Sequence, residues 1–100
     1  MADLDIRPQD LATVHAILGA TLPATARIWA FGSRAARKAR RGSDLDLAVD
    51  VGRELTQDEE VALAVAFEES DLPYTVDIVD LHSVSESFRH IIKQTAQPLV

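Results

Sequence analysis

Apolar residues recur at helical spacing near the start of the chain. Leu11, Val14 and Leu18 lie at positions i, i+3 and i+7, which places them on one face of a helix. Pro8 suits the first turn of that helix, and Gly19 is typical of the position where a helix stops. The pattern therefore predicts a helix over residues 8–19.

Two later amphipathic segments follow capping-box sequences, in which Ser or Thr and a Glu three positions later satisfy each other's backbone N–H groups. Thr56 and Glu59 have this spacing and predict a helix over residues 57–70. Ser83 and Glu86 have it too, and they predict a last amphipathic helix that ends before Pro98.

Residues 27–31, which are β-branched and aromatic, predict a buried strand, and residues 74–81, rich in β-branched residues, predict another strand. Between them, the alternation of Asp with apolar residues predicts a strand over residues 44–50. Residues 35–40, rich in helix formers, predict a short helix that begins near Ser33 or Arg34. The tail from Ala96 to Val100 leaves a short strand and a frayed end equally open. The order αβαβαβα predicts an α/β (α+β) fold, with a small mixed sheet of three or four strands flanked by helices.

The length and composition of the chain limit the functions that it can have. One hundred residues, 47% hydrophobic and 26% charged, predict a single globular domain over residues 1–100. The net charge of −6 argues against binding nucleic-acid backbones, so no direct nucleic-acid binding is expected. No apolar run approaches the ~20 residues that span a bilayer, and no secretory leader is apparent. We therefore expect a cytoplasmic protein without membrane contact.

Basic charge is concentrated in one place: residues 34–41 hold five of the ten Lys and Arg residues, and this patch could meet phosphates. It adjoins a carboxylate pair, Asp44 and Asp46. Side chains alternate along a strand, so these two project to the same face about 6.6–6.8 Å apart at their Cα atoms, which is close enough to share a metal ion.

A third carboxylate, Asp77, lies in the middle of a predicted strand, where an unpaired Asp is costly. Asp80 lies nearer the strand end, where solvation or capping is easy, so Asp77 is the better site candidate. Three converging carboxylates repel one another unless a cation compensates them. Two Mg²⁺ ions would serve nucleotidyl transfer, with Asp77 placed to activate an incoming hydroxyl.

Phosphate binding is predicted for the Gly32-Ser33 turn, through Ser33 and the backbone N–H groups that open the short helix. Arg34 and Arg40 are candidates for charge-assisted bonds to phosphate, although a surface role is about equally open for both. Ser43 is grouped with these binding residues because it shapes the turn and orients Asp44.

Taken together, Gly32-Ser33-Arg34, Arg40, Ser43-Asp44-Leu45-Asp46-Leu47 and the strand around Asp77 resemble the minimal nucleotidyltransferases of the DNA polymerase β-like superfamily. The resemblance spans roughly residues 10–95. It implies that Asp44, Asp46 and Asp77 are metal-binding and catalytic, and that Gly32 and Ser33 bind the phosphates of ATP.

Members of this family commonly act as antitoxins paired with HEPN-domain ribonucleases. The resemblance therefore implies transfer of AMP from ATP to a tyrosine of the toxin, which silences it. The chain departs from the family pattern at Ala36-Arg37 and Arg41-Gly42, so its loop is expected to be more basic and more helical.

Other interpretations stay open at this stage. Asp44 could cap a turn, Asp46 and Asp77 could be solvated strand residues, and Arg37 and Lys38 are better explained as a solvated helix face. The enzyme could instead act on a small-molecule hydroxyl, with a homodimer or hetero-oligomer supplying the missing wall of the site. The protein could also neutralise a toxin by binding alone, since its acidic surface suits a basic partner.

Overall fold

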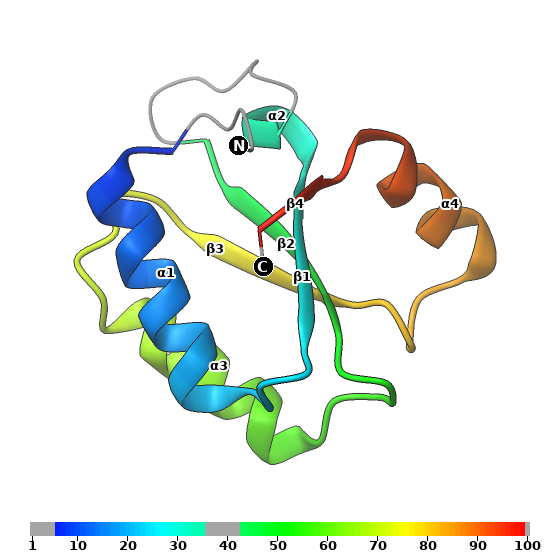
Figure 1. The fold of residues 1–100 in the computed structure, drawn as a ribbon, viewed down its shortest axis with the longest axis horizontal. Helices are drawn as coiled ribbons and strands as arrows, with labels where there is room; N and C mark the ends of the chain where they lie inside the picture. Colours follow the sequence, from blue (N-terminus) through cyan, green and yellow to red (C-terminus); the bar gives the residue numbers. More distant parts are fainter. Residues whose placement is uncertain (1–5, 36–42, 100) are drawn as a thin grey trace.

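The computed structural model describes residues 6–35 and 43–99, and these form a four-stranded sheet flanked by helices (Figure 1). The elements in chain order are α1 (Pro8–Thr21), β1 (Arg27–Phe31), α2 (Gly32–Ala35), β2 (Leu45–Asp50), α3 (Gln57–Glu68), β3 (Val76–Asp80), α4 (Glu86–Thr95) and β4 (Gln97–Pro98). The predicted mixed sheet and element order are confirmed, and the tail adds a short fourth strand.

The strands lie in the order β3-β2-β1-β4. β1 pairs with β2 and with β4 in antiparallel fashion, whereas β2 and β3 are parallel. The end of β1 and the start of β2 therefore lie next to each other at one end of the sheet. The parallel pairing places the start of β3 at the same end.

Helices cover both faces of this sheet. α1 and α3 pack side by side over one face, where Val14, Leu63 and the inward-facing Leu47 belong to the main core cluster (Figure 1). α4 covers part of the other face, and its buried Ile92 packs there with Ala48 and Leu81. Among the described residues, no helix combines the length and apolar character needed to cross a membrane.

The end of α1 differs from the prediction. Pro8 lies in the first turn as expected, but the helix runs through Gly19 to Thr21. The Leu22 N–H donates to the Leu18 carbonyl at 2.9 Å, which completes the last turn before Pro23. Gly19 does not adopt a positive φ, so its assignment as a helix stop was wrong.

The two predicted capping boxes had different outcomes. Thr56 and Glu59 exchange both bonds, at 3.1 and 2.9 Å, and confirm the start of α3. Ser83 does not cap α4: the N-cap is Ser85, whose Oγ accepts from the Phe88 N–H at 3.2 Å. Ser83 instead donates its Oγ–H to the Asp80 carbonyl at 3.3 Å.

Several other boundaries shift by a few residues. α2 begins at Gly32, earlier than predicted, and the remainder of the predicted helix beyond Ala35 lies outside the described residues. β3 is shorter than residues 74–81, and α3 ends at Glu68. β2 begins at Leu45, so Asp44 precedes the strand and does not belong to it. This last difference matters for the site, because the sheet itself does not hold Asp44.

Candidate functional site

Two of the predicted site carboxylates face each other across neighbouring strands. Asp46 on β2 pairs in register with Asp77 on β3, and on its other side with Phe31, the last residue of β1. Side chains in register project to the same face, and neighbouring strands lie about 4.8 Å apart. The parallel pairing of β2 and β3 therefore joins Asp77 to a residue thirty-one positions earlier.

Asp44 belongs to the same group, as the electrostatics of the site show. Burial raises the pKa of Asp46, and the charges of Asp77 and Asp44 raise it further. Burial also raises the pKa of Asp77, as do the charge of Asp44 and its hydrogen bond with that carboxyl group. The three carboxylates predicted from the sequence thus converge, and their mutual repulsion favours a compensating cation.

Gly32 allows the end of β1 to approach this group. Its φ is +75°, a left-handed conformation that side chains rarely adopt. A Cβ at this position would collide with Asp46 Oδ2 and would lie 3.3 Å from its Cγ. Gly32 is therefore required where the chain passes the Asp46 carboxylate, whereas its contact with phosphate stays a prediction.

Arg34 is buried, and its guanidinium is directed at the chain that leads into Asp44. Its Nε and Nη2 donate to the Ser43 carbonyl at 2.9 and 2.8 Å. The same guanidinium lies over the Tyr74 ring, with Cζ 3.9 Å from the ring centroid. Phosphate binding by Arg34 stays a prediction. Arg40 and the side chain of Ser33 lie outside the described part of the chain.

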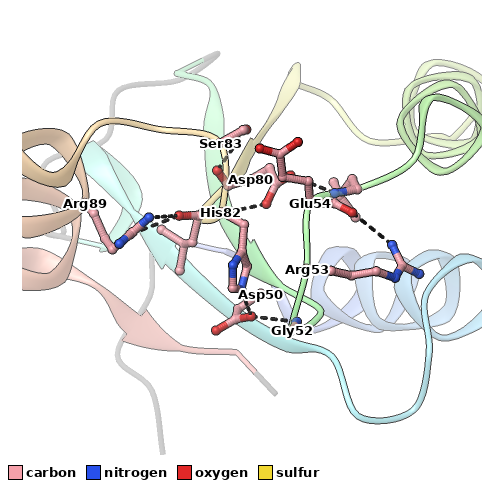
Figure 2. A network of polar contacts seen from close by, with 10 residues as sticks. Asp50, Gly52, Arg53, Glu54, Asp80, His82, Ser83 and Arg89 are labelled. Atoms are coloured by element: carbon pink, nitrogen blue, oxygen red, sulfur yellow. Dashed lines mark hydrogen bonds and ion pairs between the residues drawn. The ribbon is translucent and has the colours of Figure 1, made fainter.

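Asp80 has a different task from Asp77. It is buried, and its carboxylate accepts from the Leu55 N–H at 2.8 Å and from the His82 N–H at 2.9 Å (Figure 2). It projects to the opposite face from Asp77, because neighbouring strand positions alternate by odd and even number. Asp80 thus ties the end of β3 to the chain that enters α3.

Sequence reasoning missed two residues near the site, Asp10 and Tyr74. Asp10 is buried in the first turn of α1, where it binds Arg7 through two bonds of 3.0 Å. Tyr74 Oη donates to Asp10 Oδ2 at 3.4 Å. The one available signal was an acidic residue in a first helical turn, which usually indicates a helix-dipole effect and not a long-range contact.

The donor set fits Mg²⁺, a cation that is typically held by one or two carboxylates together with substrate phosphates and water. Within residues 6–35 and 43–99, no group of three or more His, Cys, Asp or Glu side chains forms a ready-made metal cage. Asp44 and Asp46 would hold the ion with the nucleotide, and Asp77 stands beside them.

The family model for polymerase beta-type nucleotidyltransferases matches residues 17–100. The chain belongs to this nucleotidyltransferase family. It is 45% identical, over 93% of its length and 81% of the relative's, to "Probable protein adenylyltransferase MntA" of Haemophilus influenzae. The family and this relative make the chain an enzyme that acts on a nucleotide.

Solved structures agree with this assignment. The nucleotidyltransferase matches a toxin–antitoxin crystallised with AMP-PNP at a TM-score of 0.77 and 27% identity, over 91% of this chain and 73% of that one. It matches a mutant of the toxin–antitoxin MntA–HpeT at 0.73 and 26% identity, over 90% and 71% of the two chains. The predicted polymerase β-like core is thus confirmed.

A cavity of about 480 Å³ adjoins Asp77 of the nucleotidyltransferase. It runs along β3 between α3 and α4, and its lining includes Asp77, Leu63 and Phe88. Phe88 and Ile91 on α4 are large apolar side chains exposed by 39% and 58%. Asp77, the third carboxylate, therefore lies beside a partly apolar surface and not in a closed pocket.

Proposed function

We propose that this nucleotidyltransferase moves AMP from Mg-ATP to a tyrosine hydroxyl of a partner HEPN ribonuclease toxin and thereby neutralises it. The observation that carries the proposal is the convergence of Asp44, Asp46 and Asp77 at the end of the sheet where β2 and β3 begin. The relative named as a protein adenylyltransferase and the toxin–antitoxin structure with AMP-PNP support the substrate and the partner.

The reaction follows from the roles of the three carboxylates. Asp44 and Asp46 would hold Mg²⁺, which neutralises charge on the phosphates when bound. The acceptor oxygen bonds to the α-phosphorus of ATP, the bond from that phosphorus to the β-phosphate oxygen breaks, and pyrophosphate leaves. The hydroxyl proton passes to Asp77, the carboxylate that stands beside the two that would hold the cation.

A protein acceptor fits the surface beside Asp77 better than a small molecule does. The cavity there lies along the edge strand β3, and the exposed apolar side chain of Phe88 is part of its lining. Among the described residues, β3 is the outermost strand on this side of the sheet. Residues of a partner protein could enclose the site, and one of them could supply the acceptor hydroxyl.

The test is intact-mass spectrometry of the cognate HEPN protein after incubation with this chain and Mg-ATP. We expect AMP adducts with the wild type and none with Asp44→Asn or Asp46→Asn. Asp50→Asn is the matched control, because Asp50 lies on β2 and on the same face as Asp46 but at the far end. It should retain the activity.

Three other outcomes would refute the proposal. Equal adduct formation by the Asp44→Asn and wild-type proteins would exclude the proposed site. Adducts on small hydroxyl compounds but not on the toxin would favour a small-molecule transferase. Full neutralisation of the toxin by a variant with Asp44, Asp46 and Asp77 all replaced by Asn would favour neutralisation by binding alone.

A further inference from the structure

A continuous series of contacts leads from helix α1 to the residue before Asp44. Arg7 binds Asp10 through two bonds of 3.0 Å, and Asp10 accepts from Tyr74 Oη at 3.4 Å. The Tyr74 ring lies under the Arg34 guanidinium, which donates two bonds to the Ser43 carbonyl. Residues far apart in sequence are thus linked through side chains to one peptide group.

Each contact compensates a buried polar group. Arg34 and Asp10 are only 8% and 5% exposed, and charges buried to that extent need partners. The Arg34 charge lies over the face of Tyr74, where a cation is attracted by the ring. The hydrogen bond with Arg7 lowers the pKa of Asp10 most, and the Arg34 charge adds a smaller lowering. Burial raises the pKa of Tyr74 to about 12, so its hydroxyl stays a donor at neutral pH.

Asp44 depends on such support because it lies outside β2. On its carboxyl side, the Leu45 N–H donates to the Thr75 carbonyl at 2.9 Å and starts the pairing with the β3 segment. On its amino side, the bonds from Arg34 fix the Ser43 carbonyl. The backbone of Asp44 is therefore held on both sides, once by the strand and once by a side chain.

We propose that Arg34, supported by Tyr74 and Asp10, is a positioning residue that fixes the Asp44 carboxylate for the cation–nucleotide complex. This inference rests on the proposed function, since it takes Asp44 as a cation ligand. It gives the buried guanidinium a role in holding the backbone next to Asp44. Supporting groups of this kind typically change metal affinity by roughly 10–100-fold when they are removed.

Arg89 provides a matched control for Arg34. Its Nε and Nη2 also donate to one backbone carbonyl, that of Leu81, at 2.9 and 2.7 Å (Figure 2). That carbonyl follows the end of β3, whereas Asp77 lies at the start of the strand. Arg34→Gln and Arg89→Gln thus remove the same type of anchor, but only the first lies beside a carboxylate of the site.

The experiment measures binding of a non-hydrolysable ATP analogue to the full chain by calorimetry over a series of Mg²⁺ concentrations, with thermal unfolding measured in parallel. We expect Arg34→Gln to raise the half-saturating Mg²⁺ concentration roughly tenfold, and Arg89→Gln to change it less than about twofold. Tyr74→Leu should shift it in the same direction as Arg34→Gln, and Tyr74→Phe, which keeps the ring, should shift it less.

Asp44→Asn, measured in the same series, separates the two proposals. If Asp44→Asn removes the Mg²⁺ dependence while Arg34→Gln and Arg89→Gln behave alike, the positioning role is refuted and the site stands. If Asp44→Asn leaves the dependence intact, Asp44 is no cation ligand and both proposals fall. Should Arg34→Gln not fold, Tyr74→Leu replaces it, and a wild-type Mg²⁺ dependence in that variant refutes the inference.

Discussion

Replacing Gly32 by Ala tests the geometry of the site most directly. Gly32 has a φ of +75°, and an added Cβ would collide with Asp46 Oδ2. Gly52 is the natural control, because its φ is +83° and no atom lies within 4 Å of a Cβ added there. Both variants carry the conformational cost, but only Gly32→Ala also displaces a site carboxylate.

The magnitudes follow from this pair. An L-residue in the left-handed region costs roughly 1–2 kcal/mol, so both variants should lose about that much stability. In a 100-residue domain each kcal/mol lowers the Tm by about 4–8 °C. Gly32→Ala should lose more than Gly52→Ala, because the Asp46 carboxylate must move. A carboxylate out of place should also weaken Mg-nucleotide binding by roughly tenfold or more.

Circular dichroism melts would give the stabilities, and calorimetric titration with Mg²⁺ and an ATP analogue would give the affinities. We expect Gly52→Ala to bind like the wild type despite its lower Tm. Equal affinities for Gly32→Ala and Gly52→Ala would refute the reasoning. The close approach of Gly32 to Asp46 would then have no bearing on the nucleotide site.

Three further predictions concern carboxylates. Because the folded state raises the pKa of Asp46, the ionised carboxylate destabilises the fold above about pH 4. Asp46→Asn should therefore raise the Tm in EDTA, and an unchanged or lower Tm would contradict this. Asp80→Ala leaves the buried Leu55 N–H without its acceptor and also removes the bond to the more exposed His82 N–H. Urea unfolding should therefore show a loss of about 1–3 kcal/mol, and a loss below about 1 kcal/mol would count against the buried network. The hydrogen bond from the Gly52 N–H lowers the pKa of Asp50 most, followed by the bond with His82. The ionised Asp50 therefore stabilises the fold above about pH 4, and this stabilisation is lost as the pH falls below that value. The stability of Asp50→Asn should accordingly vary less with pH than that of the wild type in an acid titration.

The helix boundaries predicted from the sequence were correct where the interaction that sets the boundary joins residues close in the chain. The Thr56–Glu59 capping box forms as predicted because both of its bonds span three residues. The same reasoning failed at Ser83, where Ser85 offered a second hydroxyl and the turn after β3 selected it. It also failed at Gly19, because nothing around that position ends the helix before Pro23.

The order of elements, the family resemblance and the three candidate carboxylates could all be predicted from the sequence, since these depend on spacing within single segments. How the segments combine became visible only in the folded chain. The parallel register of β2 and β3 places Asp77 beside Asp46, and burial directs Arg34 to the Ser43 carbonyl. These contacts join residues from different elements, and their partners are selected by packing and by the cost of burying an unpaired charge, which no local pattern encodes.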